Sequence, residues 1–164
     1  MLRTRQLIPP LTVHTPDGRT VRASDFKQKK NLLVAFLDAQ CLQCEDFIRR
    51  LANHAPGLRE REAAALVILL ETPSAFLTDS LPTDLIVGSD VSGRAALAFL
   101  GPDVLSSRGL EQRGIFVTDR YGELFVQWIF RGHDLPGAAE ILGWLDRIEI
   151  ACDECGAPHW SADA

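Results

Sequence analysis

Asn31-Leu-Leu-Val-Ala-Phe-Leu-Asp38, followed at once by Ala39-Gln-Cys-Leu-Gln-Cys44, is the stretch of sequence that decides the fold. Its first half is apolar on both faces, which predicts a central β-strand that is covered on each side. From about Cys41 to Arg61 the pattern changes to that of an amphipathic helix. Apolar residues recur there at spacings of three and four, namely Ile48, Leu51, Ala52 and Ala55. We therefore expect Cys41 and Cys44 where a strand gives way to a helix.

Strands and helices alternate on either side of this stretch. Residues 11–23 read as a β-hairpin around Pro16-Asp-Gly18. The remaining expected elements are strands over 64–70 and 84–89, helices over 73–81 and 92–100, a loop over 101–113, a hairpin of strands 114–118 and 123–130, and a closing helix over 138–148. This order predicts one α/β domain over residues 1–148, with a mixed sheet and helices on both faces. Residues 149–164 form a polar C-terminal tail in this prediction.

Composition indicates a single globular domain. The chain has 164 residues, 46% of them apolar, a formal charge of −5 and a mean hydropathy of +0.03, values that do not fit disorder. The longest apolar run, residues 63–70, is far shorter than the roughly 18 residues of a membrane span. No apolar stretch follows the basic N-terminus as a signal peptide would require. We expect a cytoplasmic protein without membrane contact.

Positive charge gathers at the N-terminal end. Residues 1–30 carry seven Lys or Arg against two Asp, a net charge of +5 that leaves −10 for the rest. The run Lys27-Gln-Lys-Lys30 lies between two expected strands and is interpreted as a solvated turn. A sequence pI near 5.3, without a basic stripe interleaved with aromatic residues, argues against nucleic acid as a partner.

Two cysteine pairs carry most of the chemical information: Cys41-Leu-Gln-Cys44 and Cys152-Asp-Glu-Cys155. In a reducing cytosol, thiols at this spacing are redox-active or bind metal. The thiolate is the nucleophilic form, and the start of a helix lowers a thiol pKa. Two residues between the thiols also allow a disulfide to close within the first helical turn. We expect a dithiol–disulfide couple at Cys41 and Cys44, with one of the two pKa values below the ordinary range.

Three segments carry a resemblance to a known family. Residues 10–26, residues 30–36 with the Cys pair after them, and Gln112-Arg-Gly-Ile-Phe-Val-Thr-Asp-Arg-Tyr-Gly122 resemble the peroxiredoxin/alkyl hydroperoxide reductase branch of the thioredoxin-like superfamily. The resemblance covers about residues 8–148. It implies a thioredoxin-like fold and an antioxidant, thiol-dependent oxidoreductase that reduces hydroperoxides or protein disulfides. A thioredoxin or a low-molecular-weight thiol would be its reductant, no organic cofactor is implied, and a homodimer is left open.

The resemblance also suggests roles for individual residues. Cys44 matches the peroxidatic cysteine of the family pattern Pro-x-x-x-Thr-x-x-Cys, whereas Cys41 stands at the Thr and Leu37 at the Pro. Arg113 matches the arginine that stabilises the peroxidatic thiolate. Read against thioredoxin instead, Cys41 is the attacking thiol, Cys44 is the resolving one, and Gln40 replaces a Trp. The roles of Cys41 and Cys44 therefore stay open at this point.

The second pair has three interpretations. Cys152 and Cys155, with His159 close behind, supply part of a zinc site that would need a further ligand. Alternatively they relay electrons to Cys41 and Cys44, or they have no chemical role. Two other functions compete with the oxidoreductase for the whole chain. One is a zinc-binding interaction module, and the other is a redox-inactive scaffold with the thioredoxin fold.

Overall fold

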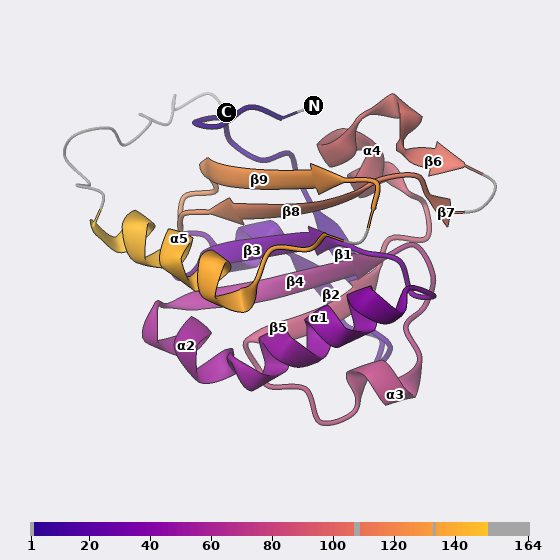
Figure 1. The fold of residues 1–164 in the computed structure, drawn as a ribbon, viewed down its shortest axis with the longest axis horizontal. Helices are drawn as coiled ribbons and strands as arrows, with labels where there is room; N and C mark the ends of the chain where they lie inside the picture. The colour runs from indigo at the N-terminus through magenta and orange to yellow at the C-terminus, as the bar shows by residue number, and fades with distance from the viewer. Residues whose placement is uncertain (1, 107–108, 133, 151–164) are drawn as a thin grey trace.

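The computed structural model describes residues 2–106, 109–132 and 134–150 (Figure 1). In chain order the elements are β1 (Thr12–His14), β2 (Thr20–Arg22), η1 (Ala23–Phe26), β3 (Asn31–Phe36), α1 (Leu42–Asn53), α2 (Ala55–Glu60), β4 (Ala63–Leu69), α3 (Ala75–Thr78), β5 (Leu85–Ser89), α4 (Arg94–Leu100), η2 (Pro102–Val104), β6 (Leu105–Ser106), β7 (Gly109–Leu110), β8 (Arg113–Thr118), β9 (Leu124–Phe130) and α5 (Ala138–Ile150). The expected alternation of strands and helices is confirmed.

A seven-stranded mixed sheet forms the centre of the molecule, in the order β2-β1-β5-β4-β3-β8-β9. Strands β3, β4 and β5 are parallel, whereas β8 runs antiparallel to β3 and β1 antiparallel to β5. The expected hairpins β1–β2 and β8–β9 are both present. Because β3 pairs with β8 through Phe36 and Gly114, the residues after β3 and those at the start of β8 meet at one end of the sheet.

Two apolar layers enclose the sheet. Alternate residues of β3, such as Leu33 and Ala35, face a core formed with α1, α2 and α5, while Leu32 and Val34 face a second core formed with α4. Figure 1 shows α1, α2 and α5 on the near face of the sheet. This arrangement accounts for the apolar character of β3 on both faces and is a thioredoxin-like architecture with helices on each side.

The prediction of one helix from Cys41 to Arg61 is wrong in one respect, because the helix is broken at His54 into α1 and α2. Pro56 lies in the first turn of α2. A proline has no N–H to donate to the preceding turn and its ring clashes with that turn, so α1 ends before it. The break leaves α1 with four buried residues, Cys44, Phe47, Ile48 and Leu51.

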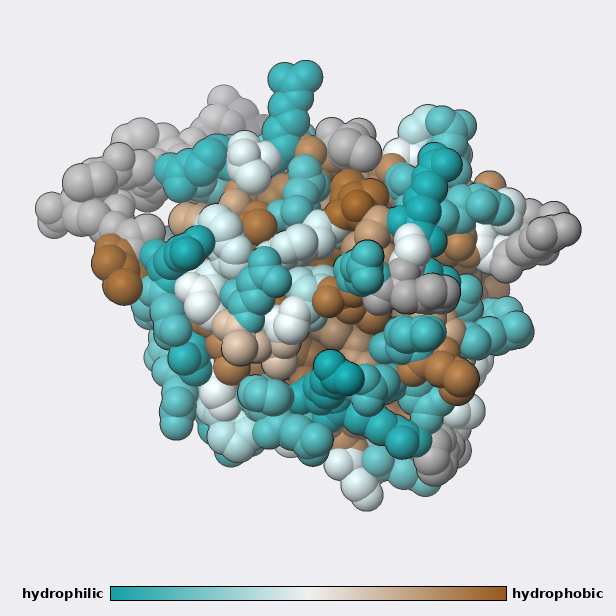
Figure 2. Space-filling model, viewed as in Figure 1, coloured by the Kyte–Doolittle hydropathy of each residue, from teal (hydrophilic) through white to brown (hydrophobic). Residues whose placement is uncertain are grey.

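The segment expected to be a loop over 101–113 also differs, because it contains η2 and the strand pair β6–β7, in which each strand has two residues. Such short strands leave no periodicity in the sequence. No helix within the described part of the chain is long and apolar enough to span a membrane. On the face shown in Figure 2, hydrophilic residues predominate over α1 and α2, as the amphipathic pattern requires.

Candidate active site

Cys41 occupies the N-cap position of α1. Its backbone is extended (φ −94°, ψ 114°), and its sulfur accepts a hydrogen bond from the backbone N–H of Cys44 at 3.3 Å. Its carbonyl accepts the N–H groups of Cys44 and Glu45, both at 3.0 Å. The sulfur therefore sits at the positive end of the helix dipole, where a thiolate is favoured.

Cys44 lies one helical turn further along and is more deeply buried. It is 1% exposed against 9% for Cys41, and both residues are free thiols. Burial, together with a side-chain hydrogen bond and charge repulsion from Cys41, raises the pKa of the Cys44 thiol to about 12. Cys44 is therefore protonated at neutral pH while Cys41 is reduced.

Two groups act on Cys44 in the opposite direction. A backbone hydrogen bond from Asp38 and the positive charge of Arg113 both lower the Cys44 pKa, although burial outweighs them. Arg113 begins β8 and is 12% exposed, with Nη2 3.7 Å from Asp38 Oδ2 and Nη1 donating to the Gly132 carbonyl at 3.1 Å. Its Nε is buried without a hydrogen-bond partner among the described residues. The guanidinium thus keeps one buried donor available at the site.

Asp38 connects the strand end to the thiols. Its Oδ1 accepts the Gln40 N–H at 2.9 Å and its carbonyl accepts the Cys41 N–H at 3.3 Å, which shapes the turn between β3 and α1. A small cavity of about 60 Å³ adjoins this turn, lined by residues 37–40 together with Leu70, Glu71, Gly109 and Leu110. Space beside the turn is therefore limited to a small group or to the end of a larger molecule.

The structure brings together the three residues that the sequence suggested for one site: Cys41, Cys44 and Arg113. Asp38 was not among the predicted site residues, although a polar residue two positions after a fully buried strand is a usable signal for a site. Cys152, Cys155 and His159 lie outside the described residues. Within the described part, no three His, Cys, Asp or Glu side chains are grouped so that they could hold a metal ion.

Comparison with known proteins identifies the family and the fold. The model of the AhpC/TSA family matches residues 4–126. A search of curated proteins finds no significant match. Among solved structures, the reduced 2-Cys peroxiredoxin of Plasmodium vivax is similar with a TM-score of 0.74 at 18% identity, covering 90% of this chain and 82% of that one.

Two further structures extend the likeness over nearly the whole chain. AhpC of Mycobacterium tuberculosis gives a TM-score of 0.73 at 18% identity, covering 98% of this chain and 99% of its own. The yeast mitochondrial 1-Cys peroxiredoxin gives 0.77 at 14% identity, covering 100% of this chain and 85% of its own. At such identities the structures establish the shared fold, and the family match rests on the sequence of residues 4–126.

Proposed function

Because the chain belongs to the AhpC/TSA family, we propose that it is a thiol-dependent oxidoreductase in which Cys41 and Cys44 alternate between a dithiol and a disulfide. Its electron acceptor in this proposal is a hydroperoxide or a protein disulfide. A thioredoxin or a low-molecular-weight thiol restores the dithiol. A homodimer stays a prediction.

Cys41 is the attacking thiol in this proposal. The observation that carries the assignment is its N-cap position, where its sulfur accepts the Cys44 N–H at 3.3 Å. That hydrogen bond and the helix dipole stabilise a thiolate, which is the nucleophilic form. Cys44 is the weaker candidate, because its pKa is raised to about 12. The family pattern would instead make Cys44 the attacking residue, so the two assignments give opposite mutant phenotypes.

In the proposed cycle, two electrons pass from the Cys41–Cys44 dithiol to the substrate. The Cys41 thiolate attacks one peroxide oxygen, which breaks the O–O bond, forms a sulfenic acid on Cys41 and releases an alcohol after protonation. The sulfur of Cys44 then attacks the Cys41 sulfur, which forms the disulfide and releases water. With a disulfide substrate, the Cys41 thiolate attacks one sulfur, forms a mixed disulfide and releases the first substrate thiol. Cys44 then attacks the Cys41 sulfur, which forms the Cys41–Cys44 disulfide and releases the second substrate thiol.

Arg113 and Asp38 support the second step. Two causes of the raised Cys44 pKa, the hydrogen bond and the charge repulsion from Cys41, depend on the reduced state of Cys41. Once Cys41 is a sulfenic acid or a mixed disulfide its negative charge is gone, so the Cys44 pKa falls. Arg113 and the Asp38 backbone then favour the Cys44 thiolate. The resolving thiol therefore becomes more reactive once Cys41 has reacted, although its burial persists.

The test compares peroxide consumption and disulfide reduction in three proteins. All carry the Cys152→Ser and Cys155→Ser substitutions, so that only the first pair is followed; one has no further change, one adds Cys41→Ser and one adds Cys44→Ser. We expect Cys41→Ser to abolish both activities and their first chemical step. Cys44→Ser should lose turnover and yet accumulate a sulfenic acid that a dione probe can trap.

The reverse pattern, in which Cys41→Ser forms a trappable sulfenic acid and Cys44→Ser does not, would transfer the attacking role to Cys44. If the parent protein consumes no peroxide and reduces no disulfide with any thiol reductant, the scaffold interpretation replaces the enzyme. Reversible titration of the pair with a dithiol separates that result from a missing substrate.

A further inference from the structure

A second pocket lies at the end of the sheet where β3 begins, whereas the thiols follow the end of β3. It has a volume of about 260 Å³ and an apolar lining that includes Ile8, Leu11, Phe26 and Leu32. Its volume is near the lower end of the roughly 300–1,000 Å³ of small-molecule sites. This pocket contains part of the basic N-terminal region that the thiol chemistry does not use.

Backbone hydrogen bonds tie the three walls of this pocket together. The Ile8 N–H donates to the Gly122 carbonyl at 2.9 Å, the Ala23 N–H to Leu11 at 3.0 Å, and the Gln28 N–H to Arg120 at 2.7 Å. The N-terminal segment, the η1 region and the β8–β9 turn therefore form a closed ring. These bonds also pair backbone N–H and carbonyl groups of the three walls with one another. The surface left to line the pocket is mainly that of apolar side chains. The pocket is formed before any ligand enters.

The charges at the pocket are mostly positive, and they are unequally neutralised. Lys30 pairs with Asp84 at 2.5 Å, and Arg120 pairs with Glu62 and Glu149 at 3.4 and 3.3 Å. The pocket's acidic residue, Asp119, uses Oδ1 to accept the N–H groups of Tyr121 and Glu123.

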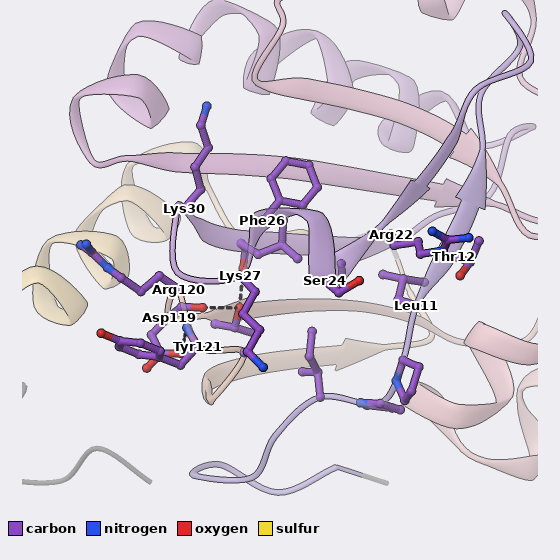
Figure 3. A pocket seen from close by; sticks show the side chains of 17 residues that line it. Leu11, Thr12, Arg22, Ser24, Phe26, Lys27, Lys30, Asp119, Arg120 and Tyr121 are labelled. Atoms are coloured by element: carbon purple, nitrogen blue, oxygen red, sulfur yellow. Dashed lines mark hydrogen bonds between the residues drawn. The ribbon is translucent and has the colours of Figure 1, made fainter. Parts of the chain in front are cut away.

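Arg22 differs from these cations. Its side chain forms no ion pair with any described residue. Figure 3 shows Arg22 beside Thr12 at one end of the pocket, Tyr121 at the other end, and Lys27 between them. The pocket thus offers an uncompensated guanidinium at the edge of an apolar interior.

We propose that this pocket binds a small molecule with an apolar body and a single carboxylate. The apolar side chains would cover the body, and the forked N–H groups of Arg22 fit a carboxylate in a bidentate manner. The hydroxyls of Thr12 and Ser24, which also line the pocket, are further donors at the same end. This inference does not depend on the chemistry at Cys41 and Cys44.

The test is an NMR titration of the full, isotope-labelled chain with 4-phenylbutyrate and with its uncharged amide. We expect saturable shifts at the amides of Phe26, Lys27, Tyr121 and Gly122, with the carboxylate binding about tenfold more tightly than the amide. Arg22→Gln should remove that difference. The matched control is Lys29→Gln, since Lys29 is an exposed cation of the same region that does not line the pocket. It should leave both affinities unchanged.

Three results would overturn the proposal: shifts that do not saturate in the wild type, equal affinity for the carboxylate and the amide, or an Arg22→Gln variant that binds the carboxylate as tightly as the wild type. Equal weakening by Lys29→Gln would also reject it, because a general loss of positive charge would then explain the effect. Arg22 is exposed, so its substitution is not expected to disturb folding.

Discussion

The backbone N–H of Cys44 donates to the sulfur of Cys41 across 3.3 Å, so the two thiols of the pair have different environments within one helical turn. The Cys41 sulfur caps the helix, whereas Cys44 lies in its first turn and is the more deeply buried of the two. In the proposed function this asymmetry assigns the attacking role to Cys41 and the resolving role to Cys44.

Thiol titration should show that Cys44 resists ionisation in the reduced pair. In a Cys152→Ser, Cys155→Ser background, Cys44 should stay protonated through the ordinary thiol range, because burial above all raises its pKa to about 12. Cys41→Ser removes the charge repulsion from Cys41 and should lower the pKa of Cys44. Thiolate absorbance against pH, measured in the parent protein and in the Cys41→Ser variant, reports the ionisation of Cys44. Ionisation of Cys44 within the ordinary thiol range in the parent protein would contradict the prediction.

Mild oxidation should join Cys41 to Cys44. They lie within one helical turn and are both free, so closure needs only a local change at the start of α1. Peptide mapping of the wild type under non-reducing conditions identifies the pair. Recovery of Cys41 linked mainly to Cys152 or Cys155 would instead make the C-terminal pair the direct partner.

Arg113→Gln should slow formation of the disulfide severalfold, because it raises the pKa of the Cys44 thiol further. The cause is the loss of the positive charge that favours the Cys44 thiolate. The lifetime of the trapped sulfenic acid reports this step, and Arg113→Lys should restore part of the rate. Arg94→Gln, an exposed arginine on α4, is the control. An unchanged lifetime in Arg113→Gln would exclude this role.

Deleting residues 151–164 tests the second cysteine pair. We propose that this pair relays electrons to the first one, so the deletion should slow re-reduction of the oxidised enzyme and leave the first chemical step intact. Rapid-mixing kinetics with peroxide and with the reductant measure the two steps separately. Loss of bound zinc in the truncated protein would favour the metal site at Cys152, Cys155 and His159 instead, and unchanged recycling and metal content would remove both roles.

Asp84→Asn should lower the free energy of unfolding by about 1–3 kcal/mol near neutral pH. Asp84 is buried beside Lys30 and Arg59; burial alone would raise its pKa, but hydrogen bonds from both partners lower it. A lowered folded-state pKa stabilises the fold above the unfolded pKa, and this contribution is lost as the pH falls through the folded value. Wild type and variant should therefore converge in acid. Denaturant unfolding against pH tests this, with the exposed Asp79→Asn as control.

Sequence patterns predict those parts of this molecule that depend on neighbouring residues. The apolar run of β3 and the spacing of Ile48 and Leu51 in α1 follow from local periodicity, and both are confirmed. Pro56 was a local signal for the break at His54 that the helical pattern concealed. The β6–β7 hairpin is too short to leave any pattern.

The chemistry of the site was less predictable because it depends on contacts distant in sequence. Cys41, Cys44 and Arg113 were identified by spacing and resemblance, and they do lie together. The raised pKa of Cys44 follows above all from its burial on the core-facing side of α1, which no local pattern measures. The pairing of Asp38 with Arg113 joins residues that only the β3–β8 register brings together.

The β1–β2 hairpin limits how strands of other molecules can pair with the edge of the sheet. It meets β5 at a single registered pair, His14 and Ser89, and Gly88 permits that approach because a Cβ there would lie 2.9 Å from the His14 carbonyl oxygen. The hairpin therefore covers the edge of the parallel strands at the Ser89 end of β5. The outermost strand is instead β2, three residues long, and its Arg22 N–H is already bonded to Asp25 Oδ2. A short, partly satisfied strand is a poor template for a strand of another molecule, so the part of the edge that the hairpin covers is protected against edge-to-edge aggregation.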